Sequence, residues 1–430
     1  MVFIKINTKS YLKILSLSVF ILFLVSCKAV GPDYEGAPEL EVPENWENQL
    51  NSEFNETGAS QTQWWTLFND PVLNDLISRA AVDNLDAKIA LARVEVARAN
   101  FGIADAARSP ELDGVGDVSE KSQSKSVSGD RDTGLYSSIG LDISWEIDIF
   151  GYVRRSIEAA DAQLERSVEA YRDVMVILYA EIAKNYVALR TAQERLQYAL
   201  ENVKSQKDTL RIVNARYKAE LVSEVDLLQS EQNLAAAESN IPLFFARINE
   251  LSNGLAILLG KNPGTLNSEL KQSYGIPHVP EKTVVQVPRE ILRQRPDIRE
   301  AERLLAQETA EVGIATAEEY PRFNLNGTFG YDSKEFDNQF SSDSRYWSFG
   351  PNFRWNIFDG GATQAAIEVQ DAQVEEARVN YEKKVLTAFE EVENAIKSYK
   401  EEKQRNASLN VSVTAAKKVN KITLARYTSG

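Results

Sequence analysis

Few residues of this chain have the types and the spacing that enzyme chemistry requires. The 430 residues include one Cys and one His, Cys27 and His278, which excludes a disulfide framework and leaves too few ligands for a zinc site. Asp142, Glu146 and Asp148 share one face of an alternating segment, and the last two could imitate a hydrolase carboxylate pair. Because no pocket-forming motif surrounds them, we interpret all three as lining a water-filled lumen, and we expect no catalysis, no metal site and no cofactor.

The sequence before Cys27 indicates a chemical modification of this residue and not catalysis. Lysines precede an apolar run that ends in Leu24-Val25-Ser26-Cys27, and the first acidic residue is Asp33. A basic start followed by an apolar run of this length is typical of a secretory signal peptide and is too short for a permanent anchor. Its last four residues resemble a bacterial lipobox, in which a peptidase cuts before the cysteine and the thiol receives a lipid. We predict a signal peptide at residues 1–26 and lipidation at Cys27; the alternative is a buried free cysteine.

Charge and hydropathy exclude two broad classes of protein. The chain has 48 basic and 63 acidic side chains, a net charge of -15, and removal of residues 1–26 with their three lysines makes it -18. Such an acidic chain lacks the basic face that nucleic-acid binding needs. A mean hydropathy of -0.33 excludes a bundle of membrane-spanning helices, but it leaves open a membrane β-barrel, whose strands alternate polar and apolar residues.

The sequence contains two copies of one unit. Gly102-Ile103-Ala104 recurs 211 positions later as Gly313-Ile314-Ala315, and Trp145 and the matches after it recur 210 positions later, from Trp355 onward. A register held over this distance predicts a tandem repeat. The second copy stops at the counterpart of Glu220, so we expect about 40 further residues after it. The resulting division is a signal peptide at 1–26, a lipidated extended arm at 27–63, repeat 1 at 64–260, a linker at 261–287 and repeat 2 at 288–430.

Each copy contains a helix too long for an ordinary globular core. Residues 152–218 and 362–429 contain neither Pro nor Gly, and at about 1.5 Å per residue such a helix is roughly 100 Å long. A heptad seam in both copies predicts coiled-coil packing, and the alternative is an amphipathic helix on a conventional core. The seam residues of the first copy are Met175, Tyr179, Ile182, Tyr186 and Leu189, and their counterparts 210 positions later have the same spacing. We also expect a turn at 218–223, a kink at Pro242, and helix starts at Pro71 and Pro296.

Strand-like segments lie between the helices of each copy. Apolar and polar residues alternate at 141–149, 323–332 and 347–357, and more weakly at 111–121. Strands of this length can cross a bilayer when tilted, and their apolar faces are rich in aromatic residues. A half-buried soluble sheet gives the same period, but the lipobox and the aromatic residues favour the membrane. Because four strands cannot close a barrel, which needs about eight, we expect three copies to form one barrel of 12 strands.

Three motifs resemble those of one family. They are Cys27 to Tyr34 (CKAVGPDY), Trp64 to Leu73 (WWTLFNDPVL) and Leu292 to Ile298 (LRQRPDI). With the repeat, they resemble the TolC-like outer-membrane factors over nearly all of residues 20–430, and within them the lipidated efflux branch similar to OprM and CusC. The resemblance implies an α+β membrane protein. It would be a homotrimer whose 12-stranded outer-membrane β-barrel continues into a long periplasmic barrel of coiled-coil helices.

The same resemblance implies partners and a mechanism. The trimer would sit in cell outer-membrane lipid with a large periplasmic extension, and it would dock onto a periplasmic adaptor and an inner-membrane pump of the resistance-nodulation-division type. Small molecules or metal ions, driven by that pump, would leave passively through a gated duct. The alternatives are the channel of a type I protein secretion system and a structural coiled-coil envelope lipoprotein.

The resemblance also places a periplasmic gate at the helix turns. Asp226 and Tyr427 correspond to family residues whose contacts hold the aperture closed. Gly430 keeps the glycine of the second turn, whereas Glu220 replaces it in the first, which leaves the geometry of that turn open. The alternative for Asp226 is a helix-end residue, because the helix dipole favours a carboxylate in the first turn.

Overall fold

The structure is a computed structural model that describes most of residues 28–428. Residues outside the description are 1–27, 39, 42, 44–45, 48–53, 56–62, 123–125, 127–132, 279–282, 285–289, 291–293 and 429–430. The chain divides into two compact units. Unit 1 comprises residues 1–40, 94–167 and 299–383, and unit 2 comprises residues 41–93, 168–298 and 384–430.

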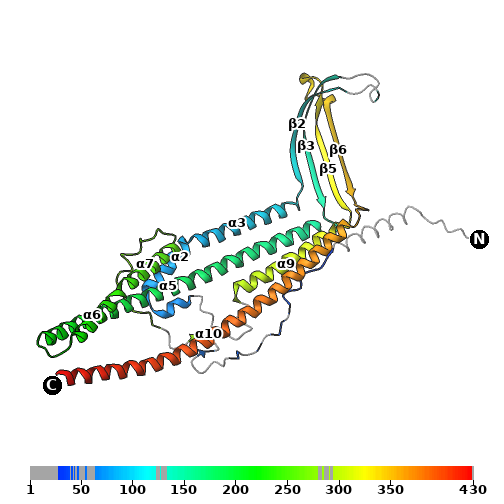
Figure 1. Ribbon diagram of the computed structural model, residues 1–430. Coiled ribbons are helices and arrows are strands. Elements are labelled where there is room, and N and C mark those ends of the chain that lie inside the picture. Colours follow the sequence, from blue (N-terminus) through cyan, green and yellow to red (C-terminus); the bar gives the residue numbers. More distant parts are fainter. Residues whose placement is uncertain are drawn as a thin grey trace, which may run out of the picture. The chain divides into compact units, whose positions relative to one another are not determined.

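Unit 1 contains a four-stranded antiparallel sheet (Figure 1). Its strands, in spatial order, are β2 (Glu111–Ser122), β3 (Thr133–Ile147), β5 (Arg322–Ser333) and β6 (Arg345–Arg354). All four predicted strands are therefore present, although β3 begins earlier than predicted and β6 ends earlier. β2 and β6 are the edge strands, and each pairs with one strand in the described part of the chain.

Along the chain, each pair of strands is preceded by one helix and followed by another. α3 (Leu85–Ala106) precedes β2 and α9 (Pro296–Ala317) precedes β5. β3 leads into α5 (Tyr152–Lys218) and β6 leads into α10 (Ala362–Thr428), each of 67 residues. The prediction of two uninterrupted long helices is confirmed. Within the described residues, no helix combines the length and the apolar character that a membrane span requires.

Unit 2 contains α2 (Pro71–Asp83), α6 (Glu224–Ser239) and α7 (Ile241–Leu258). Asp70 caps α2 by accepting hydrogen bonds from the backbone N–H groups of Val72 and Leu73, as expected for an Asp-Pro start. The helix is interrupted between α6 and α7, just before Pro242, because proline cannot continue the hydrogen bonding of the preceding helix. Short elements are η1 (Trp64–Phe68) and the parallel pair β1 (Phe54–Asn55) and β4 (Thr283–Val284).

The predicted heptad seam forms part of the hydrophobic core of unit 2. Ile182, Tyr186 and Leu189 of α5 have no exposed surface. They lie in one cluster with residues of α2, α7 and the linker, namely Leu73, Leu76, Ile77, Leu255, Leu259, Leu266 and Leu270. This part of the seam is therefore buried against short helices of unit 2. Coiled-coil packing of the long helices stays a prediction.

Candidate functional site

The sheet of unit 1 has one polar and one apolar face. One row of the polar face, read across the four strands in register, is Asp113, Asp142, Thr328 and Ser348. The neighbouring row, on the opposite face, is Gly114, Leu141, Phe329 and Trp347. Trp347 is 71% exposed, so the apolar face is open within the chain. An exposed apolar face opposite a polar one is what a strand between lipid and water requires.

Two of the three predicted lumen residues lie on the polar face. Asp142 is half-buried on β3. Glu146 lies four residues further along β3, on the same face, and forms an ion pair with Arg322, with 3.3 Å between Oε1 and Nε. The Arg322 guanidinium also lies 3.6 Å from the centre of the Tyr152 ring. The function of Asp142 and Glu146 in lining a lumen stays a prediction.

Asp148 is a helix cap and not a strand residue, which corrects its predicted place on the strand, and its lining of a lumen stays a prediction. β3 ends one residue before it. Its carboxylate accepts hydrogen bonds from the backbone N–H groups of Gly151 and Arg154, both at 2.9 Å, and from Nε of Arg154 at 3.0 Å. Unsatisfied amides at a helix start favour a carboxylate, so capping of α5 overrides the alternation of the strand. Asp359 does the same before α10, and its hydrogen bonds, first from the Thr363 hydroxyl, lower its pKa to about 2.

Asp226 lies in the first turn of α6. It forms a capping box with Ser223: its carboxylate accepts hydrogen bonds from the Ser223 backbone N–H (2.9 Å) and hydroxyl (2.7 Å), and its own N–H donates to the Ser223 hydroxyl (3.3 Å). These bonds, first that from the hydroxyl, lower the pKa of the Asp226 carboxyl. The structure therefore places Asp226 in the predicted turn as a helix-capping residue, and its part in a gate stays a prediction.

The turn before α6 keeps a glycine-like backbone without a glycine. Glu220 has a φ of 59°, in the left-handed region. The N–H of Leu221 donates to the carbonyl of Arg216, and the N–H of Glu220 donates to that of Tyr217, both at 2.9 Å. This pair of bonds is the Schellman motif that usually ends in glycine. The turn therefore has the geometry that a glycine usually provides, and the glutamate adopts the strained conformation.

Two other predicted sites can be placed only in part. Tyr427 belongs to α10 by its backbone, and its side chain lies outside the described part of the chain. Cys27 lies outside it as well, immediately before Lys28. The Lys28 ammonium forms an ion pair with Asp33, with 3.0 Å between Nζ and Oδ2. Lipidation of Cys27 stays a prediction.

A buried arginine, which the sequence analysis did not single out, holds the start of the arm. The Arg155 side chain is 3% exposed. Its Nε donates to the carbonyl of Val30 (3.1 Å), and Nη2 donates to the carbonyl of Gly31 (3.2 Å) and to Asp33 Oδ1 (2.6 Å). Its Nη1 donates to Glu158 (2.7 Å). The guanidinium thereby clamps the first described residues of the arm onto α5.

Glycines allow the arm to approach this closely. Gly31 has a φ of +81°, and a β-carbon there would lie 2.5 Å from Gly313 Cα on α9. A β-carbon at Gly313 would lie 2.7 Å from Arg155 Cδ. One at Gly151 would lie 2.4 Å from Ala29 Cβ. The Gly-Pro-Asp motif and the Gly-Ile-Ala motif of the second repeat are therefore two sides of one contact.

Unit 2 contains a second polar cluster that the sequence analysis missed. The Tyr186 hydroxyl donates to Asp70 at 2.8 Å, and burial, more than any other cause, raises the pKa of Tyr186 to about 12. Arg190, fully buried, lies over the Tyr186 ring and donates to the carbonyl of Gln272 at 2.7 Å. The heptad spacing marked Tyr186 as a core residue, but it carried no signal for these polar partners.

Comparison with known proteins identifies the family. The family model for outer membrane efflux proteins matches residues 76–261 and 287–430. The chain belongs to the outer membrane efflux protein family. Nodulation protein T of Rhizobium leguminosarum bv. trifolii is 29% identical over 417 residues, covering 96% of this chain and 87% of that protein. Cation efflux system protein CusC of Escherichia coli (strain K12) is 30% identical over 381 residues, covering 87% and 81%.

A solved structure shows the same fold. The outer-membrane channel OprN superposes with a TM-score of 0.82 at 33% identity, covering 88% of this chain and 85% of that one. This outer membrane efflux protein is therefore a channel of the outer membrane with a periplasmic extension, and it is not an enzyme. The resemblance inferred from the three sequence motifs is confirmed.

Proposed function

We propose that three copies of this chain form the exit duct of a tripartite efflux system. Their sheets close a 12-stranded barrel in the outer membrane, and their long helices continue it as a coiled-coil barrel in the periplasm. A lipid on Cys27 adds a second anchor. Small molecules or metal ions pass through passively, driven by an inner-membrane pump of the resistance-nodulation-division type that a periplasmic adaptor joins to the duct. The duct itself uses no cofactor.

The four-stranded sheet carries this proposal. Its apolar face is exposed, and its edge strands β2 and β6 each have one neighbour. A bilayer core contains no water to satisfy unpaired backbone groups, so an open edge cannot remain there. Closure needs about eight strands or more, and one chain supplies four. Closure therefore needs at least two copies, and three copies supply the 12 strands of the proposed barrel.

The pairing of the strands supports a tandem repeat. Gly116 of β2 pairs with Ile139 of β3. The sequence offsets of 211 for the first strand and 210 for the second convert this pair into Gly327 and Phe349, and these residues are paired between β5 and β6. The equal lengths of α5 and α10 agree with this correspondence. A trimer of two-repeat chains would therefore surround its axis with six similar units.

The gate belongs to the same proposal. Asp226 lies beside the turn at one end of α5, and Tyr427 lies near the corresponding end of α10. We place the closed aperture of the duct at these helix ends, where contacts between helix pairs would hold it shut until the adaptor and the pump engage.

Mass and conductance test the proposed duct together. Purified protein in detergent should be a trimer by light scattering, and it should form discrete channels in planar lipid bilayers. A monodisperse monomer would contradict the assembly. A trimer that passes no current would contradict the duct and would support a structural envelope lipoprotein instead.

A further inference from the structure

Two glycines of the edge strand β2 have open space where their counterpart on β5 is covered. A β-carbon at Gly327 would lie 2.8 Å from Ile143 Cγ2 and 3.1 Å from Phe349 Cδ2, so both neighbouring strands cover this glycine. Gly116 is its counterpart, and there the nearest atom would be a backbone oxygen 3.8 Å away. At Gly114 no atom would lie within 4 Å. The apolar face of β2 is therefore indented at Gly114 and Gly116.

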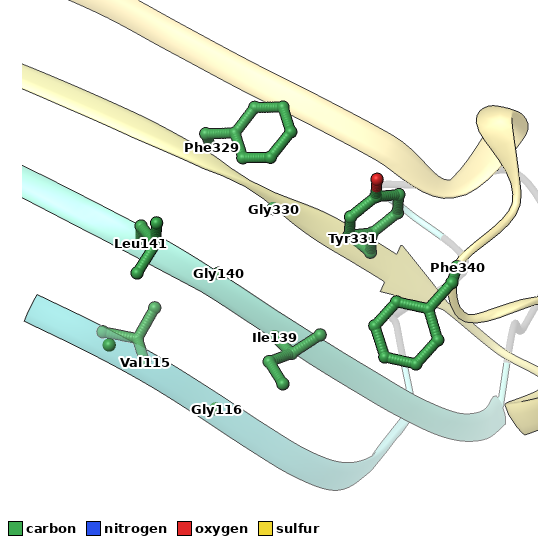
Figure 2. Close-up of a pocket in the computed structure, with 10 residues that line it drawn as sticks. Val115, Gly116, Ile139, Gly140, Leu141, Phe329, Gly330, Tyr331 and Phe340 are labelled. Atoms are coloured by element: carbon green, nitrogen blue, oxygen red, sulfur yellow. The ribbon is translucent and has the colours of Figure 1, made fainter.

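The indentation belongs to a larger hollow on the apolar face. Gly114 and Gly116 form the β2 side of an apolar hollow of about 540 Å³. Ile139, Leu141 and Phe329 line it from β3 and β5 (Figure 2). Among the residues that the structure describes, no strand lies beyond β2 on that side of the hollow.

The other edge strand carries exposed aromatic side chains at the complementary positions. Phe353 of β6 is 65% exposed. Trp355, just beyond β6, is 50% exposed, and its indole N–H donates to the carbonyl of Glu319 at 3.0 Å. Its repeat counterpart Trp145 makes the corresponding bond to Arg108, also at 3.0 Å. The indole of Trp355 is thus held at this edge in the same way as that of Trp145, which has β5 beside it.

The repeat correspondence converts the pairing inside the chain into a pairing between chains. Shifting β3 forward by 210 positions gives β6, and shifting β5 back by 211 gives β2. The observed pair Ile143–Gly327 then becomes Phe353 opposite Gly116 of the partner subunit. Ile143 covers Gly327 within the chain, so Phe353 would cover the open Gly116 in the same manner.

We propose that β6 of one subunit pairs antiparallel with β2 of the next in this register, with aromatic side chains seated over the two glycines. Phe353 lies over Gly116 of the partner subunit, and Trp355 over Gly114 of the partner subunit. An aromatic ring across a cross-strand glycine covers the exposed backbone and fixes the register. This inference rests on the proposed trimer. The occupant is a second copy because lipid cannot satisfy the two unpaired backbone edges.

Other registers lose this fit. A shift by one residue sets the apolar face of β6 beside the polar face of β2, which a barrel in lipid does not allow. A shift by two residues keeps the faces but sets Phe353 opposite Val118 or Gly114 of the partner subunit, so one aromatic residue always loses its glycine. On the polar face, the proposed register sets Asn352 opposite Asp117 of the partner subunit.

Disulfide trapping tests the register. The double variant Asn352→Cys with Asp117→Cys should form a covalent trimer when oxidised in membranes, seen on denaturing gels without reductant. The two positions lie on opposite edges of one chain's sheet, and the three strand spacings of roughly 4.8 Å between these edges alone separate them by at least about 14 Å, so a bond within one chain is excluded. Controls shifted by two residues in either direction are Asn352→Cys with Ser119→Cys and Asn352→Cys with Val115→Cys. The unmodified chain reports any background from Cys27.

The outcomes separate this inference from the proposed function. Stronger linkage in either shifted control, with trimers and conductance intact, overturns the register and leaves the duct standing. Absence of any trimer in the unmodified protein overturns both. Efficient linkage only in the Asp117 pair supports the register.

A pair of compensating substitutions, which enlarge the side chain at Gly116 and shorten that at Phe353, tests the aromatic contact itself. A β-carbon at Gly116 would have Ser138 O, 3.8 Å away, as its nearest neighbour, so Gly116→Val should fold, but it should lower the temperature at which the trimer dissociates in detergent. Adding Phe353→Ala should recover most of that loss, because the removed ring makes room for the valine. Gly350→Val, at an equally open site on the polar face of β6, is the matched control for a valine in a barrel strand. Failure of Phe353→Ala to recover the loss would overturn the contact.

Discussion

The clamp of Arg155 on the arm gives a quantitative prediction. Arg155→Met keeps the apolar stem and removes the guanidinium, together with its bonds to the carbonyls of Val30 and Gly31. A hydrogen bond from a charged group contributes about 1.5–3 kcal/mol. These carbonyls regain water once the arm is released, so we take the lower figure for each, about 3 kcal/mol in total. That corresponds to a roughly 100-fold rise in the released population.

Amide hydrogen exchange measures this release directly. The N–H of Val30 donates to the carbonyl of Phe150 at 2.9 Å, so its exchange reports whether the arm is docked. In Arg155→Met, exchange at Val30 should be roughly 100-fold faster, while amides in the middle of α5 keep their rates. Arg172→Met is the matched control, because Arg172 is on the same helix, half-exposed, and paired with Glu169. Unchanged exchange at Val30 in Arg155→Met would refute the clamp.

The same clamp should respond to acid. The hydrogen bond from Arg155, more than that from Lys28, holds the pKa of the Asp33 carboxyl below its ordinary value. A carboxyl whose pKa is lowered by docking contributes fully above its ordinary pKa, near 4, and loses the contribution as pH falls through the lowered value. Exchange at Val30, corrected for its intrinsic rate, should therefore accelerate only in acid. Asp33→Asn should abolish this acceleration of exchange at acidic pH.

Three other sites give independent predictions. Glu220→Gly should raise the free energy of unfolding by about 1 kcal/mol in urea titration, because glycine tolerates the left-handed backbone, whereas Ala219→Gly should not. The polar face of the sheet should make the channel prefer cations, and Asp142→Asn should weaken that preference; anion preference in reversal potentials under a KCl gradient would contradict it. Asp226→Ala with Tyr427→Phe should raise the resting conductance of the channel without adaptor, whereas Ser223→Ala, which removes only the capping hydroxyl, should not. An unchanged closed state in the double variant would leave Asp226 as a capping residue alone.

Local periodicity accounts for what could be predicted from the sequence. The alternation at 323–332 matches β5 almost residue for residue, since every second side chain there is apolar. The Pro-free and Gly-free stretches matched α5 and α10 for a similar reason, because helix breakers act through the backbone of their own segment. The first half of β3 was missed because Gly134, Ser137 and Gly140 hide its alternation.

The missed residues depend on contacts between distant segments. Arg155 and Asp33 are separated by 122 positions, and nothing in the local pattern of α5 marks an arginine that will be buried under the arm. The prediction for Asp148 failed for another reason. Two local rules applied to it, strand alternation and helix capping, and the free amides of the following helix made capping the stronger.

The two repeats differ where strands join helices. Inside the chain, Phe150 after β3 stacks on Tyr320 before β5, with 4.7 Å between the ring centres. The repeat counterparts of these rings are Gly360 and Ser109, which would meet at the joint between subunits. In the proposed trimer, the stacked pair would therefore be present at the joint within one chain and absent from the corresponding joint between chains.

An ion pair beside the strand–helix joint differs between the two repeats in the same way as the stacked rings. Arg322 pairs with Glu146 inside the chain, and their repeat counterparts are Glu111 and Asn356, which cannot form an ion pair. In the proposed trimer, the joints between subunits would thus depend on strand pairing and on the aromatic rings over glycines, whereas the joints within subunits also have stacking and charge. Because fewer side-chain bonds resist motion at the joints between subunits, we expect any opening of the helices below the barrel to move whole subunits apart and not to separate the two repeats of one chain.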